Sequence, residues 1–272
     1  MIDLHIHTTF SDGEKDVATI LKMAEEKGLV AISITDHDCL DAYDVLKNPE
    51  IRALYSGKII TGVEMSTNVN GTMVHILGYG FDVDKMKNYI VRDDGALERR
   101  LVEKKFAEIG VIAKIEGTVG REITENAVVA LDNSDFKMQW PEGVVKSLHL
   151  WWDHFNNRDS FLFLDLASHF MSPSEAIDKI HACGGVAILA HPAQYKQFDM
   201  EIVEKLKNKV DGIECYHWVH DEEYREKLIK ICKDNGLIIT GGSDYHGLLS
   251  PLGSQNVPSE LLGQHEVLNR DY

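Results

Sequence analysis

Histidines and carboxylates gather in seven short clusters, each placed where an apolar, strand-like segment ends. The clusters are His5-Ile6-His7, Ser11-Asp12-Gly13, Thr35-Asp36-His37-Asp38, Gly62-Val63-Glu64, Val74-His75-Ile76, Ala190-His191-Pro192 and Gly242-Ser243-Asp244-Tyr245-His246-Gly247. Imidazole and carboxylate groups without a thiolate are ligands that suit zinc, manganese or iron(II). The clusters therefore predict a site for divalent metals.

Spacing within the clusters supports this interpretation. His5 and His7 are two residues apart in a strand-like segment, so both side chains lie on one side of it, and Asp244 and His246 repeat that spacing. Each cluster alone has an ordinary alternative, such as a turn, an ion pair or a buried histidine. Gathering nine imidazole and carboxylate groups in one place would be costly without a cation, which favours a shared metal site.

Short strands that alternate with amphipathic helices must position these clusters. We expect strands at 2–6, 29–35, 58–63, 73–77, 186–190, 210–215 and 237–240, and helices at 16–27, 41–55, 172–183, 200–209 and 221–235. Asn70-Gly71 predicts a tight hairpin, and Pro49 interrupts the second helix. Repeated βα units predict a parallel sheet closed as a barrel, with the carboxyl ends of its strands on one face. The clusters should meet on that face.

This alternation is lost between Asp93 and His169. The segment contains a charged helical stretch at 96–110 and an aromatic stretch at 148–163, but no convincing βα unit. We interpret residues 93–169 as a mostly helical insertion, or cap, between the two parts of one barrel domain, 1–92 and 170–272. A separate pair of domains is the alternative.

Composition limits the partners. The chain has 272 residues, 44% of them hydrophobic, and 28 basic against 44 acidic residues give a net charge of −16. This charge argues against binding to duplex nucleic acid. No run of consecutive apolar residues comes near the length of about 18 that a membrane span requires, and the N-terminus lacks the pattern of a signal peptide. We expect a cytoplasmic protein without a membrane partner, and the oligomeric state stays open.

The order of the motifs HxH, SDG, TDHD, GVE, VHILGY, AHP and GSDYHG resembles the PHP (polymerase and histidinol phosphatase) superfamily of metal-dependent phosphoesterases. The resemblance implies an α/β fold, a distorted (β/α)7 TIM-like barrel, with two or three divalent ions (Mn, Zn or Fe). Its ligand positions are filled by His5, His7, Asp12, His37, Glu64, His75, His191, Asp244 and His246. By this resemblance Glu64 bridges two metals. His5, His7 and Asp244 hold one metal, His75 and His191 a second, and Asp12, His37 and His246 a third.

Within the superfamily the chain looks most like the bacterial subgroup that removes phosphate from nucleoside 3′,5′-bisphosphates and trims short RNA from its 5′ end. The implied reaction is hydrolysis of a phosphate monoester of a small nucleotide or short oligonucleotide by a metal-bound hydroxide. Histidinol-phosphate phosphatase and a non-catalytic PHP module that supports a partner protein are the alternatives. The insertion favours the nucleotide subgroup, and the complete ligand set disfavours a degenerate module.

Further residues are candidates for substrate binding or proton transfer. Arg99 matches a phosphate-binding arginine of the subgroup, and Arg121 is a possible replacement for a second one. His220, after the strand at 210–215, could also touch a phosphate; a surface position is the alternative for each of these. His191 or Asp244 could carry a proton, although a metal ligand is a poor general base. The absence of Walker, GxSxG and GxGxxG motifs argues against NTPase, serine hydrolase and Rossmann enzymes.

Overall fold

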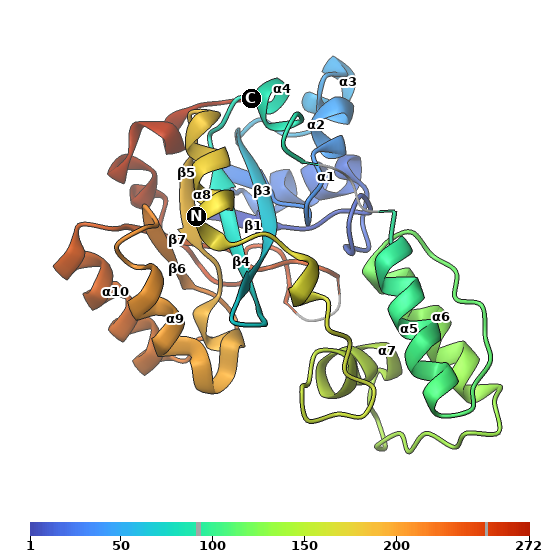
Figure 1. Ribbon diagram of the computed structural model, residues 1–272. Helices are drawn as coiled ribbons and strands as arrows, with labels where there is room; N and C mark the ends of the chain where they lie inside the picture. Colours follow the sequence, from blue (N-terminus) through green and yellow to red (C-terminus); the bar gives the residue numbers. More distant parts are fainter. Residues whose placement is uncertain (91–93, 248–249) are drawn as a thin grey trace. The chain divides into compact units, whose positions relative to one another are not determined.

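The structure is a computed structural model that describes residues 1–90, 94–247 and 250–272 (Figure 1). The chain divides into two compact units, one made of Met1–Val91 and Phe170–Tyr272, the other of Arg92–His169. Residue 93, at which the expected insertion begins, lies outside the described residues. No helix in the described part of the chain has both the length and the apolarity that a membrane crossing requires.

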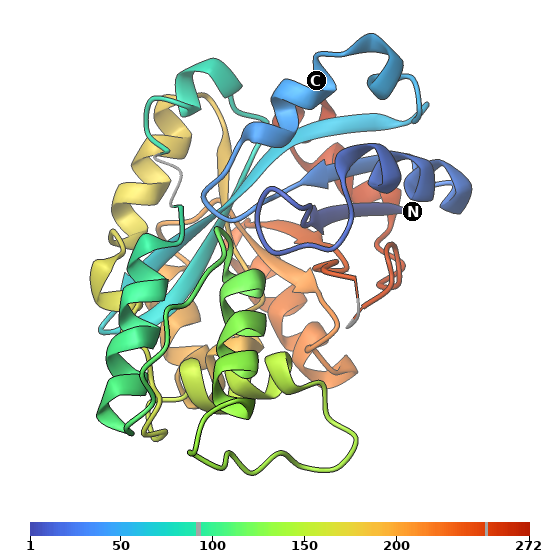
Figure 2. The ribbon, with the colours of Figure 1, turned by 90° about the vertical axis from the view of Figure 1, so that its right-hand side faces the viewer.

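The first unit is built on one sheet of seven strands whose order in space follows the sequence (Figure 2). The strands are β1 (Ile2–Ile6), β2 (Ala31–Ile34), β3 (Lys58–Val69), β4 (Thr72–Tyr79), β5 (Val186–Leu189), β6 (Gly212–Tyr216) and β7 (Ile238–Gly241). Tyr245, just after β7, exchanges backbone hydrogen bonds with His5 and His7 at 3.3 and 3.0 Å, which brings the last strand back to the first. The sheet is therefore a nearly closed barrel, as the sequence predicts.

One part of the sheet differs from the parallel arrangement expected. β1–β2, β2–β3, β5–β6 and β6–β7 are parallel pairs, whereas β4 is antiparallel to both β3 and β5. Asn70 and Gly71 both have positive φ, 51° and 82°, as a two-residue hairpin requires. The hairpin gives β3 a second partner, so β3 continues to Val69. Glu64 and His75 consequently lie inside paired strands, and the expectation that every cluster follows a strand end is wrong for these two.

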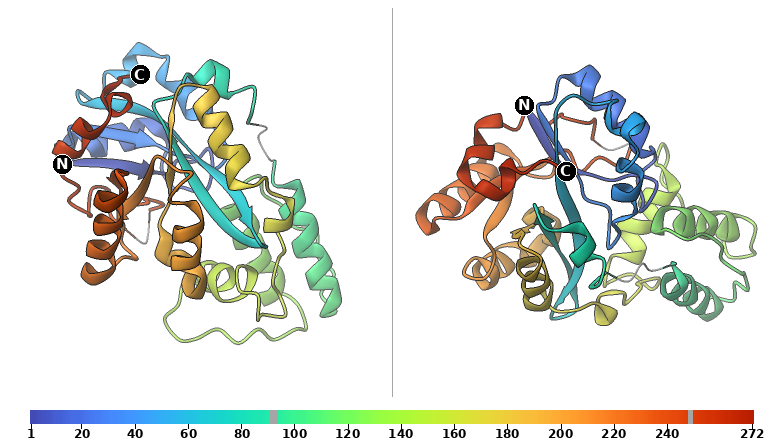
Figure 3. Two further views of the ribbon diagram at one scale, coloured as in Figure 1. Left: turned by 60° about the vertical axis from the view of Figure 1, so that its left-hand side comes forward. Right: turned by 90° about the horizontal axis from the view of Figure 1, so that it is seen from above.

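Helices cover the strands. They are α1 (Val17–Lys27), α2 (Asp41–Leu46), α3 (Pro49–Arg52), α4 (Val83–Met86), α8 (Pro173–Ala182), α9 (Asp199–Leu206) and α10 (Glu222–Asn235). Most of them match the expected ranges, whereas α4 was not predicted and α9 ends before residue 209. The side chain of Asp16 caps α1, and Gly28 ends it with a φ of 66°. α8 packs against β4 and β5, where Ile177 and Ile180 join the main apolar core (Figure 3).

Short 3-10 helices complete the first unit. They are η3 (Pro192–Phe198), which follows β5, and η4 (Ser259–Gln264) and η5 (Glu266–Asn269) near the C-terminus. Val267 and Leu268 of η5 pack with Ile2 and Leu4 of β1 in a second, smaller apolar cluster. The C-terminal segment is thus part of the packed barrel domain.

The second unit is helical. It contains α5 (Ala96–Glu108), α6 (Gly120–Asp132), α7 (Lys146–His149), a π-helical turn η1 (Leu150–Phe155) and a 3-10 turn η2 (Ala167–His169). Described residues 94–169 include no strand. Its buried side chains include Phe106 of α5 and Phe155 of η1, whose rings lie 6.5 Å apart. α5 corresponds to the charged helix expected at 96–110, whereas the sequence pattern of α6 is too weak to predict that helix with its ends.

Candidate metal centre

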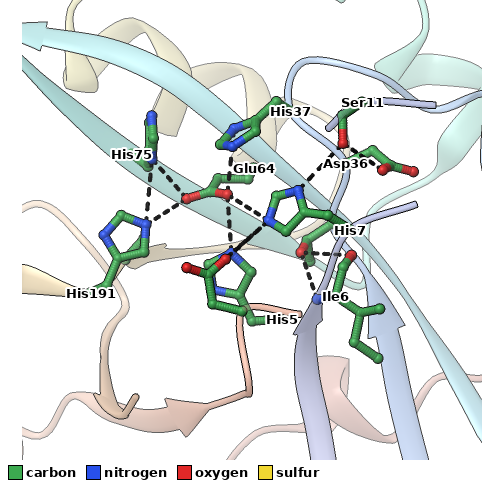
Figure 4. Close-up of polar contacts among 12 residues, drawn as sticks. His5, Ile6, His7, Ser11, Asp36, His37, Glu64, His75 and His191 are labelled. Carbon is green, nitrogen blue, oxygen red and sulfur yellow. Dashed lines mark hydrogen bonds and ion pairs between the residues drawn. The ribbon is translucent and has the colours of Figure 1, made fainter. Parts of the chain in front are cut away.

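The predicted ligands converge in the barrel around the carboxylate of Glu64, which is 1% exposed (Figure 4). Its Oε2 lies 3.0 Å from His5 Nε2 and 3.1 Å from His7 Nε2. Its Oε1 lies 2.9 Å from His75 Nδ1 and 2.7 Å from His191 Nε2. The two oxygens of one carboxylate thus face two different pairs of histidines.

Asp244 completes the first of three groups whose side-chain ligand atoms lie within 4.8 Å of one another. The group consists of His5, His7, Glu64 and Asp244. Asp244 Oδ1 is 3.3 Å from Nε2 of both His5 and His7. Two imidazoles and two carboxylates at this separation can all bind one divalent ion.

The other two groups share His37. One consists of His7, Asp12, His37 and His246, and the other of His37, Glu64 and His75. Asp12 Oδ1 is 3.1 Å from His246 Nε2, and Asp12 Oδ2 is 3.9 Å from His37 Nε2. His191 borders the last group, with its Nε2 3.4 Å from His75 Nδ1. The structure therefore brings all nine predicted residues together and places His37 between the second and third sets.

Opposite charges alternate across the cluster. Burial disfavours the charged form of His7, but the carboxylates of Asp244, Glu64 and Asp12 outweigh it and raise the pKa of His7 to about 10. The pKa of His5 is likewise raised well above its usual value, because Glu214, Glu64 and Asp244 overcome its burial. For Glu64, burial is outweighed by the neighbouring histidines, which hold its pKa well below the usual range. Burial lowers the pKa of His37 to about 3, so this imidazole is neutral.

The tautomer of His5 tests whether a metal fits. Its Nδ1 lies 2.9 Å from Glu214 Oε1, and because a carboxylate only accepts, Nδ1–H must donate. In the neutral ring this leaves the Nε2 lone pair facing Glu64 Oε2, Asp244 Oδ1 and, at 3.1 Å, His7 Nε2. Such crowding of lone pairs is favourable only with a proton or a metal cation among them.

Two buried atoms point the same way. His191 Nδ1 has no hydrogen-bond partner in the part of the chain that the structure describes. Among the described residues, Asp12 Oδ1 has beside it only the imidazoles of two other predicted ligands, His246 Nε2 at 3.1 Å and His7 Nδ1 at 3.5 Å. A buried polar atom without a hydrogen-bond partner is rare, and a bound ion would explain it. The donor set, the crowding at His5 and these two atoms all fit divalent metals.

Three buried acidic residues that the sequence analysis does not identify as site residues hold the ligands in place. Asp36 accepts hydrogen bonds of 2.7 Å from Thr8 N, Thr8 Oγ1 and Ser11 Oγ, and Ser11 Oγ lies 3.4 Å from His7 Nδ1. Asp3 accepts from the backbone N–H and the hydroxyl of Ser243, at 2.8 and 2.6 Å. These contacts fix the loops that carry His7 and Asp244.

The third is Glu214, which besides His5 Nδ1 contacts the backbone N–H of His191 at 2.9 Å. Asp3 and Glu214 each interrupt an apolar strand, Ile2–Ile6 and Gly212–Tyr216. Because a buried charge is costly, an acidic residue within a strand of this kind is the sequence signal that could have identified both.

His220 lies beside the cluster with both ring nitrogens engaged. Its Nδ1 donates to the carbonyl of Cys215 at 2.9 Å, and its Nε2 lies 3.4 Å from the backbone N–H of Ala193. Burial lowers the pKa of His220 to about 4. These bonds hold the loop after β6, and contact with a substrate stays a prediction.

The two candidate arginines belong to the second unit. Arg99 Nη1 donates to the carbonyl of Asp94 at 2.6 Å and to that of Gly117, which ties the first turn of α5 to the segment before α6. Arg121 Nη1 is 3.7 Å from Glu125, while its buried Nε has no partner among the residues that the structure describes. Their role in phosphate binding also stays a prediction.

The first unit is a nearly closed barrel of seven strands that brings together six histidines and three carboxylates. This combination is typical of metal-dependent hydrolases with a TIM-like barrel. The sequence profile of the PHP domain family matches residues 3–239, and the chain belongs to this family. The predicted family is thereby confirmed. Named relatives and solved structures support the predicted class, a metal-dependent phosphoesterase.

Relatives named for reactions of phosphate esters resemble the chain over nearly its whole length. A Haemophilus influenzae protein named 5′-3′ exoribonuclease is 29% identical over 265 residues, which cover 90% of this chain and 89% of the relative. A phosphoribosyl 1,2-cyclic phosphate 1,2-diphosphodiesterase of Eggerthella lenta is 26% identical over 258 residues, 90% and 94% of the two chains. A 3′,5′-nucleoside bisphosphate phosphatase of Chromobacterium violaceum is 24% identical, with 90% and 87% covered.

Solved structures share the fold. One described as a metal-dependent phosphoesterase from Bifidobacterium adolescentis matches with a TM-score of 0.75 and 22% identity, covering all of this chain and 96% of the other. This likeness supports the barrel architecture independently of the ligand residues.

Proposed function

We propose that the protein hydrolyses a phosphate monoester of a small nucleotide, either a nucleoside 3′,5′-bisphosphate or a short oligonucleotide, with two or three divalent ions (Mn, Zn or Fe). The observation that carries the proposal is the position of Glu64. Its two oxygens face His5 and His7 on one side and His75 and His191 on the other, at 2.7–3.1 Å. A carboxylate in this position is suited to bridge two ions.

The protein's own residues hold the ions and would handle the protons. Divalent ions in such a site lower the pKa of bound water and neutralise phosphoryl oxygens. Asp12, His37 and His246 would hold the third ion beside the bridged pair. Asp244 and His191, which are 7% and 2% exposed, are the proposed groups for moving a proton to the leaving oxygen.

The substrate class is supported by the chemistry that the named relatives share. The three names describe cleavage of RNA, of a phosphoribosyl cyclic phosphate and of a nucleoside bisphosphate, all of them phosphate esters of a nucleoside or sugar. Arg99 and Arg121 are the proposed phosphate contacts of the second unit. Each lies in the first turn of a helix of 13 residues, α5 or α6, where backbone N–H groups also favour anions. A guanidinium can grip phosphate through two parallel hydrogen bonds.

Metal analysis followed by a substrate panel tests the proposal. Purified protein should contain at least two divalent ions per chain and release phosphate from adenosine 3′,5′-bisphosphate or a 5′-phosphorylated oligonucleotide. The panel should include histidinol phosphate and phosphoribosyl 1,2-cyclic phosphate. A higher kcat/KM for either of these would overturn the proposed substrate, and the absence of stoichiometric metal would overturn the proposed chemistry.

A further inference from the structure

Six of the seven strands in the described part of the chain contain a proposed metal ligand or are followed by one within three residues, and β6 is the exception. Nevertheless it carries Glu214, and His217 follows its last residue. Glu214 is 0% and His217 2% exposed. Burial of two such polar side chains is costly unless their hydrogen bonds are satisfied, and the bonds they make lead to metal ligands on other elements.

Glu214 connects two of these elements. Oε1 accepts from His5 Nδ1–H at 2.9 Å, and Oε2 accepts from the backbone N–H of His191, also at 2.9 Å. His5 belongs to β1, and His191 follows β5. A carboxylate behind a metal-binding imidazole fixes its tautomer and raises its basicity.

His217 connects to a third element, the loop after β7. Its Nδ1 accepts a hydrogen bond from Val219 N at 3.2 Å, so the ring proton must lie on Nε2. Nε2–H then donates to Asp244 Oδ2 at 3.1 Å. This bond turns Asp244 Oδ1 toward Nε2 of His5 and His7, at 3.3 Å from each.

We propose that Glu214 and His217 are positioning residues that aim the ligand atoms of His5 and Asp244 and so set the affinity of one metal. That metal is the ion held by His5, His7, Glu64 and Asp244, and the proposal rests on the metal site proposed above. Loss of such a supporting contact lowers metal affinity about 10–100-fold. The ion near Asp12, His37 and His246 should be affected much less.

Two amide substitutions at position 217 separate positioning from folding. The side-chain nitrogen of His217→Gln reaches about as far as Nε2 and can still donate to Asp244, whereas His217→Asn is too short to do so. Both amide side chains are polar and no larger than histidine, so both fit the buried space that the His217 ring occupies. Glu214→Gln keeps an acceptor for His5 Nδ1–H but removes the charge that raises its basicity.

The readouts are metal content after dialysis against a weak chelator, Co²⁺ affinity, and the visible spectrum of the Co²⁺-loaded protein. We expect His217→Asn to lose one equivalent of metal on dialysis and to bind Co²⁺ about 10–100-fold more weakly than the wild type. The visible spectrum of its Co²⁺-loaded form should also differ from that of the wild type. His217→Gln should stay close to the wild type in metal content, Co²⁺ affinity and spectrum. Glu214→Gln should lie between the wild type and His217→Asn in the same three measurements. His181→Gln is the matched control, since His181 is an exposed histidine paired with Asp211 at 2.6 Å outside the cluster.

The outcomes distinguish this inference from the proposed function. A wild-type protein without stoichiometric metal overturns both. If the wild type loads metal and His217→Asn matches it in content, affinity and spectrum, the positioning role alone is wrong. The role is also wrong if His217→Gln is as impaired as His217→Asn, because the hydrogen bond to Asp244 would then not be what matters.

Discussion

Metal loading should release protons, because carboxylates raise the pKa of three of the ligand imidazoles, His5, His7 and His246, and so favour their protonated forms in the metal-free protein. The pKa of His7 is about 10 and that of His5 is also raised well above its usual value. A metal needs the lone pairs that these protons occupy. At pH 7, removing a proton from a group with a pKa of about 10 costs about 4 kcal/mol, since each unit is about 1.4 kcal/mol. Apparent metal affinity should therefore increase with pH up to about pH 10.

Titration calorimetry with Mn²⁺ at pH 7, repeated in buffers of different ionisation enthalpy, measures the released protons. We expect at least two for the wild type, from His5 and His7, and about one fewer for His7→Gln. His37→Gln is the matched control, since it also removes a ligand but one whose pKa of about 3 leaves no proton to release. The reasoning is refuted if the wild type releases no protons, or if both variants lower the proton number equally.

Three further changes have outcomes that the structure predicts. Glu64→Gln should abolish loading of the bridged metal pair. It should also destabilise the metal-free protein by about 3–5 kcal/mol, because it leaves buried imidazolium groups without their carboxylate. Urea unfolding in the presence of a chelator measures the destabilisation, and an unchanged unfolding midpoint would contradict it. Arg99→Ala should lower kcat/KM about 10–100-fold with metal content unchanged, and Arg99→Lys should recover only part of the lost kcat/KM. Unchanged turnover of Arg99→Ala would mean that Arg99 only ties α5 to Gly117 and does not contact a phosphate. The metal-free protein should lose stability as pH rises from 7 to 10, because the contribution of a histidine whose folded pKa is raised is complete below about 6.5 and is lost through about 10. Thermal unfolding with and without metal tests this, since the loaded protein should not show the same loss.

The elements of the barrel could be predicted because their signals are local. Asp16 and Gly28 mark the ends of α1 through a side-chain cap and a left-handed turn. Asn70-Gly71 marks the hairpin because both residues tolerate positive φ. The antiparallel direction of β4 within the whole sheet was not predicted, although the hairpin signal implies it. Pairing of β4 with β5 joins residues more than 100 positions apart, and nothing local to either strand specifies that direction.

In the second unit only part of the helical structure was predictable. α5 has a charged, strongly helical composition, whereas α6 (GREITENAVVALD) begins without a side-chain cap at Val119. Its helical state depends on burying Ile123, Ala127 and Leu131 against the rest of the unit. Tertiary packing of this kind commonly outweighs weak local propensity.

The sequence by itself determined the family and the identity of the nine candidate ligands, because each ligand lies in a short motif whose residue types and spacing are visible locally. The tertiary structure alone decided which atoms meet: that Glu64 stands between two pairs of histidines, and that His5 turns its Nε2 to the centre. His5 does so because Glu214, 209 residues away, occupies its other nitrogen. Closure of the sheet places β6 beside β7 and brings β7 back to β1. The residues that orient the ligands therefore come from other strands of the barrel, and the short ligand motifs do not contain them.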